Sequence, residues 1–271
     1  LKFRNTAKFC LDNLTGFDPE QLVAAADMQE LDRWAVTRLN SLIRRVFDSY
    51  DAYEFHAVSH AINDFCVVDL SSFYFDIIKD RLYCDGENSL SRRSAQTALF
   101  LIVDAMTRMF APILAFTCDE IWLAMPHRQA DDGRSVLFNC MVQPYEDYAL
   151  PEDAMDRWAR IAAVRSAVNG ALEQARADKT IGKSLEAEVD VTVPAEDAFL
   201  ADMDADTLAD LLIVSQVRVT VGDALSVTVA PAQGVKCARC WKVLTSVGTV
   251  AGHDTLCPRC AAVVKALPVV E

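Results

Sequence analysis

Four cysteines near the end of the chain constrain its fold more than any other feature. Cys237 and Cys240 form one C-x-x-C pair, and Cys257 and Cys260 form a second pair after a spacer of sixteen residues. This spacing is typical of a four-cysteine zinc site, in which two tight turns direct four thiolates to the corners of a tetrahedron. We expect one structural zinc ion, because four thiolates leave no coordination position for water or substrate.

The spacer between the pairs predicts a short hairpin within residues 241–256, with turns at Gly248 and Gly252. Pro258 lies inside the second pair, where a missing N–H does little harm. This stretch is too small for an apolar core, so metal binding should supply most of its folding free energy.

Two disulfides are the competing interpretation of these cysteines. The chain has nine cysteines and no apolar leader with a cleavage site, so we expect reduced thiols and a cytoplasmic protein. The other five lie in apolar or helical surroundings and are predicted to be reduced core thiols: Cys10, Cys66, Cys84, Cys118 and Cys140.

The length of 271 residues favours more than one domain. We expect domains at residues 1–150, 151–232 and 233–271. No apolar run reaches the ~18 residues that a membrane span requires, so no membrane partner is expected. The chain begins at Leu1, inside the first expected helix and without methionine, and we expect it to be a piece of a longer protein. We also expect it to be a monomer.

Residues 1–150 show helical periodicity. Apolar residues recur every three or four positions over residues 31–50, 58–83 and 99–125, with a break near Pro112. Such helices with short connections predict an antiparallel bundle, so the fold class is mainly α.

Residues 151–232 combine helix and strand. A helix should open at Pro151 and stop near Gly182, and residues 185–193 then alternate apolar and polar as a half-buried strand does. A helical segment at about 197–212 and strands at about 214–221 and 225–229 complete a small α/β unit. A zinc-ribbon-like module follows it.

Charge is distributed unevenly along the chain. The net charge of −13 argues against non-specific nucleic-acid binding, but residues 234–271 hold five basic and two acidic residues. A phosphate-bearing partner could therefore bind at the basic C-terminal end of the chain.

Two short patterns suggest a nucleotide site and a second metal site, but each is better explained without a ligand. Residues 177–184 read A-x-x-x-x-G-K-S, but a helix enters and a strand leaves, the reverse of a phosphate-binding loop. His56, His60 and Asp64 share a helix face, yet a single face supplies too few ligands for a metal, so a solvated stripe is the better interpretation.

Basic and aromatic residues supply the candidate nucleic-acid contacts. Trp241 directly follows a cysteine of the first pair and could stack on a base or pack over the zinc turn, and the sequence does not separate these. Guanidinium groups match phosphate oxygens, but isolated arginine pairs on bundle helices, here Arg44–Arg45 and Arg92–Arg93, are usually just solvated, and this alternative stays open. The full set of candidates is Arg4, Arg33, Arg44, Arg45, Arg92, Arg93, Arg239, Trp241 and Lys242.

The chain resembles the C-terminal region of bacterial isoleucyl-tRNA synthetases, which are class I aminoacyl-tRNA synthetases. Stretches shared also with the valyl and leucyl enzymes are Phe3–Thr6, Leu31–Trp34, Asp69–Tyr74, Lys79–Tyr83 and Asp119–Trp122. Two stretches single out the isoleucyl member: Ile181–Ala187 and the C-A-R-C-W and C-P-R-C cysteine pairs.

The resemblance implies an anticodon-binding bundle, a connecting α/β segment and a zinc domain that contacts tRNA(Ile). The full enzyme would attach isoleucine to tRNA(Ile) with ATP, using catalytic and editing domains that precede this region. ATP would bind only in the catalytic domain, so this part should be inactive alone and contains no catalytic residues. The acidic balance implies weak tRNA binding by this part in isolation.

Two further hypotheses remain. A zinc-stapled protein-interaction module on a helical scaffold, without an RNA role, is the alternative from a different class. A self-contained nucleotide-using enzyme rests only on residues 177–184 and is the weaker one.

Overall fold

The computed structural model describes residues 2–267, which are mainly α-helical, as the sequence predicts. The chain divides into two compact units, one of residues 1–83 with 87–151 and one of residues 84–86 with 152–271. The division into three domains stays a prediction. Leu1, expected to lie in a helix, is outside the described residues. Among residues 2–267, we find no helix with the length and hydropathy that a membrane span requires.

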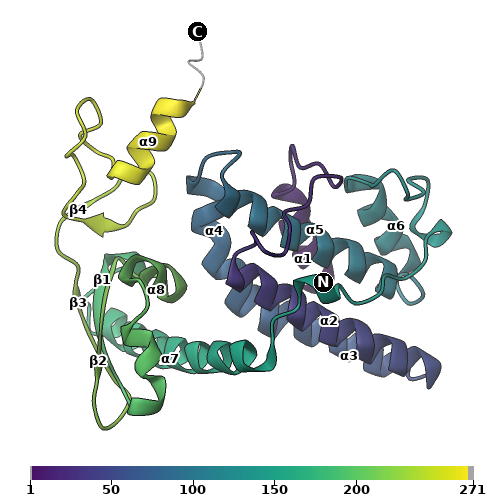
Figure 1. The fold of residues 1–271 in the computed structure, drawn as a ribbon, viewed down its shortest axis with the longest axis horizontal. Helices are drawn as coiled ribbons and strands as arrows, with labels where there is room; N and C mark the ends of the chain where they lie inside the picture. The colour runs from purple at the N-terminus through teal and green to yellow at the C-terminus, as the bar shows by residue number, and fades with distance from the viewer. Residues whose placement is uncertain (1, 268–271) are drawn as a thin grey trace. The chain divides into compact units, whose positions relative to one another are not determined.

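The first unit is a helical bundle (Figure 1). A π-helical stretch, η1, continues α3 into α4, so the predicted stripe over residues 58–83 belongs to one unbroken helical segment. The predicted break near Pro112 separates α5 from α6. The elements are α1 (Lys2–Asp12), α2 (Glu30–Asp51), α3 (Phe55–Asp64), η1 (Phe65–Tyr74), α4 (Phe75–Cys84), α5 (Leu90–Phe110), α6 (Ala115–Ala124), η2 (Val136–Phe138) and η3 (Glu146–Tyr148).

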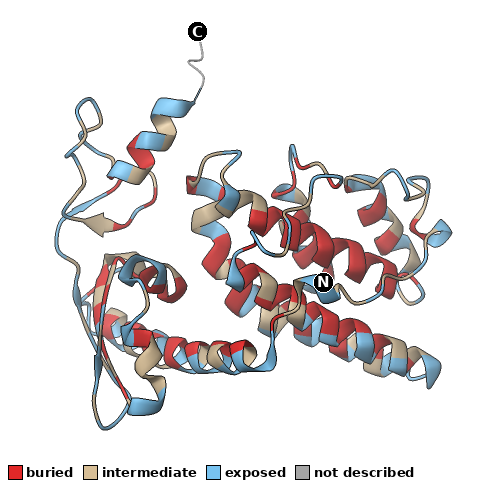
Figure 2. Cartoon of the chain, viewed as in Figure 1, coloured by how far each residue is buried: buried red, intermediate tan, exposed pale blue. Residues whose placement is uncertain are grey.

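Helix α5 is the centre of the bundle. Every residue from Ser94 to Phe110 is buried, and Figure 2 shows this helix red over most of its length. The sequence pattern predicts a single apolar stripe here, but α1, α2, α3 and α6 contact α5 on several sides. A helix surrounded in this way must satisfy its polar side chains internally.

One such polar site is a carboxylate under the N-terminal half of α5. The side chain of Asp32 is fully buried and accepts hydrogen bonds from Tyr74 Oη at 2.7 Å, Arg81 Nη2 at 2.5 Å and Ser94 Oγ at 2.5 Å. Burial and the Asp32 charge raise the pKa of Tyr74, which therefore stays a hydrogen-bond donor. These contacts tie α2, α4 and α5 together with the π-helical stretch.

A second buried carboxylate anchors the connection after α6. Asp104 accepts from Arg108 Nε at 2.7 Å and from Arg128 Nη1 at 3.2 Å. Arg108 also donates to Asp131 at 2.6 Å and lies over the ring of Trp122, with 4.7 Å from Cζ to the ring centroid. The irregular residues 125–151 are thereby held against the bundle.

In the second unit, residues 84–86 are joined by a continuous stretch that starts with α7 (Glu152–Ala177). This helix ends five residues before the predicted stop at Gly182. Lys179 adopts a left-handed conformation (φ 60°), and Thr180 N donates to Ala175 O at 2.9 Å, which closes the helix early. The remaining elements of the α/β part are η4 (Ser184–Glu186), β1 (Ala187–Val193), η5 (Ala195–Ala201), α8 (Ala205–Leu212), β2 (Gln216–Val221) and β3 (Ser226–Pro231).

The three strands form one sheet in the order β2-β1-β3. Strand β1 pairs in parallel with β2 and antiparallel with β3. The predicted alternation holds, because Val189, Val191 and Val193 are buried and α7 packs on the sheet. On the other face, Arg218 of β2 pairs with Glu188 and Asp190 of β1, both at 2.7 Å.

The last part of the second unit holds β4 (Val235–Lys236), β5 (Val243–Leu244) and α9 (Pro258–Ala266). The predicted hairpin within residues 241–256 is wrong in position, because β4 and β5 pair on either side of the first cysteine pair. The predicted turns are confirmed, since Gly248 and Gly252 have φ values of 80° and 78°. Pro258 occupies the first turn of α9, where its missing N–H has no helical partner to lose.

The prediction of five core thiols is correct for four. Cys10, Cys66, Cys84 and Cys118 are buried, but Cys140 is exposed. It lies in the irregular segment after α6, where its backbone carbonyl accepts from Arg108 Nη1 at 3.1 Å.

We predict that Asp32→Ala destabilises the bundle by about 3–5 kcal/mol, because it leaves the Arg81 guanidinium without its buried counter-charge. Asp12→Ala is the control, since Asp12 pairs with Lys8 on the exposed face of α1 and should cost less than about 1 kcal/mol. Urea unfolding followed by circular dichroism measures both. Equal losses for the two variants would contradict the role given to Asp32.

Candidate zinc centre and nucleic-acid interface

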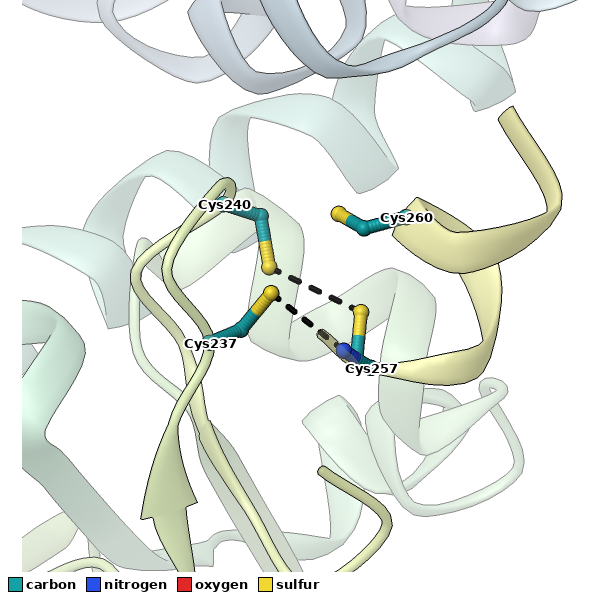
Figure 3. Close-up of side chains that lie close together, drawn as sticks. All are labelled: Cys237, Cys240, Cys257 and Cys260. Carbon is teal, nitrogen blue, oxygen red and sulfur yellow. Dashed lines mark hydrogen bonds between the residues drawn. The ribbon is translucent and has the colours of Figure 1, made fainter. Parts of the chain in front are cut away.

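The structure brings the four predicted cysteines to one point. Their sulfur atoms all lie within 4.8 Å of one another, and Cys240 Sγ is 3.9 Å from Cys257 Sγ (Figure 3). Four sulfurs at about 2.3 Å from a central ion would be about 3.8 Å apart at tetrahedral corners. The donor set and its spacing therefore fit one zinc ion.

Backbone hydrogen bonds build the turn that carries the first pair. Cys237 N donates to Lys242 O at 2.9 Å, and Trp241 N donates to Cys237 O at 3.0 Å. The turn places Trp241 in the left-handed region (φ 65°), which is uncommon for a bulky residue. Gly234 precedes the turn with φ 120°, and a Cβ there would lie 2.3 Å from the Leu244 carbonyl carbon.

The second pair lies at the start of α9 and is tied to the first. Cys257 N donates to Cys237 Sγ at 3.3 Å, and Ala238 N donates to Thr255 O at 2.9 Å. Figure 3 shows the Cys257 and Cys260 side chains approaching from the α9 side and those of Cys237 and Cys240 from the opposite loop.

The sulfurs form the buried centre of this module. All four cysteines are buried, and the apolar side chains packed against them are only partly buried, namely Leu244, Val247 and Leu256. The apolar surface removed from water is small, so folding here depends on the metal.

The thiols differ in how readily they ionise. Burial opposes ionisation of Cys237, but backbone N–H groups of Cys240, Cys257 and Arg239 stabilise its thiolate and lower its pKa to about 6. Burial raises the pKa values of Cys240 and Cys260, and the neighbouring sulfurs raise them further. Four thiolates can therefore coexist only when a cation balances their charge.

The basic residues beside the first pair have structural partners. Arg239 donates to the Cys84 carbonyl, and its Nη1 lies 3.8 Å from Cys260 Sγ. Both partners belong to the second unit, which includes residues 84–86. Lys242 is buried and pairs with Asp210 of α8. Trp241 between them is 58% exposed. Of this predicted trio, only the aromatic ring faces largely toward solvent.

Most candidate arginines of the bundle contact other parts of that unit. Arg4 pairs with Glu120 at 2.7 Å, and Arg44 pairs with Glu146. Backbone carbonyl oxygens accept from Arg33 (those of Tyr148 and Ala149) and from Arg92 (those of Leu82 and Glu87). Arg93 lies over the Phe17 ring at 5.0 Å.

Arg45 differs from these arginines. It is exposed on α2, and within the described part of the chain it has no ion-pair partner. Among the candidate arginines of the bundle, Arg45 is therefore the one whose charge is most available to an external phosphate.

One residue near the candidate interface was missed by the sequence analysis. Lys183 follows Gly182 between α7 and β1, and its Nζ lies 5.8 Å from the centroid of the Trp241 ring. The N–H groups of Gly182 and Lys183 both donate to Glu186, so the apparent phosphate loop holds the protein's own carboxylate. Lys183 and Trp241 lie 58 positions apart in the sequence, so no local pattern could link them.

The histidine stripe on α3 forms no metal group. His56, His60 and Asp64 are exposed, and in residues 2–267 the four cysteines are the only set of three or more ligands placed to share an ion. The interpretation as a solvated stripe stands.

Two parts of the chain match models of known protein families. Residues 32–191 match the model described as the anticodon-binding domain of tRNA ligase, and residues 234–263 match a zinc finger found in FPG and IleRS. The chain belongs to the family of tRNA ligase anticodon-binding domains. The zinc-finger match and the four-sulfur cluster together assign it one structural zinc, as the cysteine spacing predicts.

Individual relatives agree with the resemblance seen in the sequence. The chain is 44% identical to isoleucine--tRNA ligase of Syntrophotalea carbinolica, over 97% of this chain and 29% of the relative. It is 41% identical to the isoleucine--tRNA ligase of Colwellia psychrerythraea and 39% identical to that of Caldanaerobacter subterraneus, over 96% of this chain in both. These alignments cover 30% and 29% of the relatives, so the chain spans less than a third of their length.

We predict that Cys257→Ser releases about one zinc per chain and unfolds residues 234–267, while the bundle keeps its helices. Metal analysis and nuclear magnetic resonance spectra of the C-terminal module measure this. Cys140→Ser is the matched control, because Cys140 is exposed and remote in sequence from the cluster. An intact C-terminal module in metal-free protein would contradict the prediction.

Proposed function

We propose that this chain is the tRNA-recognising part of an isoleucine--tRNA ligase. The observation that carries the proposal is the presence of an anticodon-binding domain and a zinc finger of the IleRS type in one chain that matches these ligases over 97% of its length. The whole protein would attach isoleucine to tRNA(Ile) with ATP, and this part would bind the anticodon arm. The comparisons give no support to a protein-interaction module without an RNA role.

The finer assignments belong to the same proposal. The whole protein would be a class I synthetase acting as a cytoplasmic monomer, with catalytic and editing domains outside this chain. This part alone would neither activate isoleucine nor charge tRNA. In support of the cytoplasm, none of the nine cysteines forms a disulfide, as expected in a reducing compartment.

We further propose that Cys237, Cys240, Cys257 and Cys260 are the zinc ligands and that zinc acts by folding the module. When bound, the ion supplies charge balance for four thiolates and no reactive position. The residues around it then fix the turn on which Trp241 lies.

Among the candidate RNA contacts, the geometry favours Trp241 and Arg45. The exposed ring of Trp241, with Lys183 near it, offers a stacking surface beside a cation. Arg45 offers an uncommitted guanidinium to a phosphate. For the remaining candidates, binding RNA would require the exchange of an existing protein contact.

We predict that tRNA(Ile) binding weakens about tenfold or more between about 50 and 200 mM salt, as phosphate contacts require. Arg45→Ala should lower the affinity about two- to tenfold and flatten the salt dependence. Arg157→Ala is the control, because Arg157 pairs with Asp153 on α7. Filter binding with tRNA(Ile) and an unrelated tRNA tests this, and salt-independent or equal binding would refute the proposed function.

We predict that Trp241→Gly weakens tRNA binding about tenfold without destabilising the zinc module. Glycine adopts the left-handed conformation at this position more easily than tryptophan does, so the turn should be retained. Zinc content and thermal unfolding report the fold, and binding of tRNA(Ile) reports the function. A variant that loses zinc instead would show that the ring packs on the module.

A further inference from the structure

The two residues that follow Trp241 are held by the α/β part of the second unit. Lys242 is buried, and its ammonium group pairs with the Asp210 carboxylate on α8. Val243 N donates to Ser215 Oγ at 2.7 Å, and Gln216 Nε2 donates to Val243 O at 3.2 Å. Ser215 is itself fixed by its donation to Leu185 O at 2.5 Å.

These contacts lie directly beside a strained residue. Trp241 keeps a left-handed backbone, and such a conformation persists only where the surroundings enforce it. The zinc turn fixes Trp241 from the N-terminal side through Cys240. The contacts of Lys242 and Val243 fix it from the C-terminal side.

We propose that Asp210 and Ser215 position Trp241 for RNA, and that Lys242 is a positioning residue that acts through Trp241 and contacts no phosphate. The inference rests on the proposed function and deepens it. Without these contacts, the zinc turn still forms, but the orientation of the exposed ring is no longer fixed. Ordering the ring before binding reduces the entropy lost on complex formation.

The two possible roles of Lys242 predict effects of opposite sign when Asp210 is removed. If Lys242 contacts a phosphate, loss of Asp210 frees its charge and removes a repulsive carboxylate, so RNA should bind more tightly. If Lys242 positions Trp241, loss of Asp210 leaves the orientation of the Trp241 ring unfixed, and RNA should bind more weakly.

The experiment uses the full 271-residue chain and the anticodon-arm RNA of an isoleucine tRNA as the probe. Asp210→Ala is compared with Asp206→Ala, which removes an exposed carboxylate from the same helix. We expect Asp210→Ala to weaken binding about fivefold and Asp206→Ala to leave it equal or slightly tighter. Lys242→Met should weaken binding while leaving the salt dependence unchanged, because no phosphate contact is lost.

A double-mutant cycle shows whether the effect passes through Trp241. In a Trp241→Gly background, Asp210→Ala should cause no further loss of affinity. A general structural role of Asp210 would instead lower affinity in both backgrounds. Fluorescence gives a second readout, since Trp34, Trp122 and Trp158 are buried and quenching by acrylamide reports mainly on Trp241.

Ser215→Ala provides a second test in case Asp210→Ala loses zinc. It removes the acceptor for Val243 N without changing charge, and it should weaken RNA binding and alter Trp241 quenching with zinc retained. Asp210→Ala binding as tightly as Asp206→Ala would overturn the positioning role, and so would a flattened salt dependence in Lys242→Met. If wild-type protein shows no salt-sensitive binding to the RNA, the proposed function itself fails.

Discussion

The C-terminal module depends on balancing the charge of four buried thiolates. Burial and mutual repulsion raise the pKa values of Cys240 and Cys260, so the cluster cannot hold four negative charges without a cation. Leu244, Val247 and Leu256 around it are only partly buried. The metal therefore replaces a hydrophobic core, and the left-handed turn at Trp241 exists because the sulfurs beside it are fixed.

In the bundle, buried negative charge is also balanced by positive charge, which comes from arginine side chains instead of a metal. Asp32 and Asp104 are fully buried. Asp32 pairs with the Arg81 guanidinium and accepts from Tyr74 and Ser94, and Asp104 pairs with the guanidinium groups of Arg108 and Arg128. Such sites contribute little net stability compared with apolar replacements, but removing one partner is costly. They fix which helices meet around α5, and they hold residues 125–151 against the bundle through Arg108 and Arg128.

Whether a basic side chain already pairs with a protein carboxylate decides how well it can serve the proposed RNA binding. A cation that already neutralises a protein carboxylate gains less from a phosphate than an uncommitted one does, because the first contact must be exchanged. Arg4, Arg44 and Lys242 are in this position, while Arg45 is not. The chain can therefore be acidic in total and still present a few selected groups to RNA.

The sequence by itself determined the zinc site, the helical bundle and the alternation of β1, because each depends on local spacing. A C-x-x-C pair forms one turn wherever it lies, and a period of 3.6 or 2 needs no distant residue. Only the tertiary structure decided that α5 is buried on all sides from Ser94 to Phe110, that Cys140 is exposed and that β4 and β5 lie on either side of the first cysteine pair. It also decided that Lys242 meets Asp210 and that Lys183 approaches Trp241. These outcomes depend on residues distant in sequence, whose contacts are set by how the elements pack rather than by their own patterns.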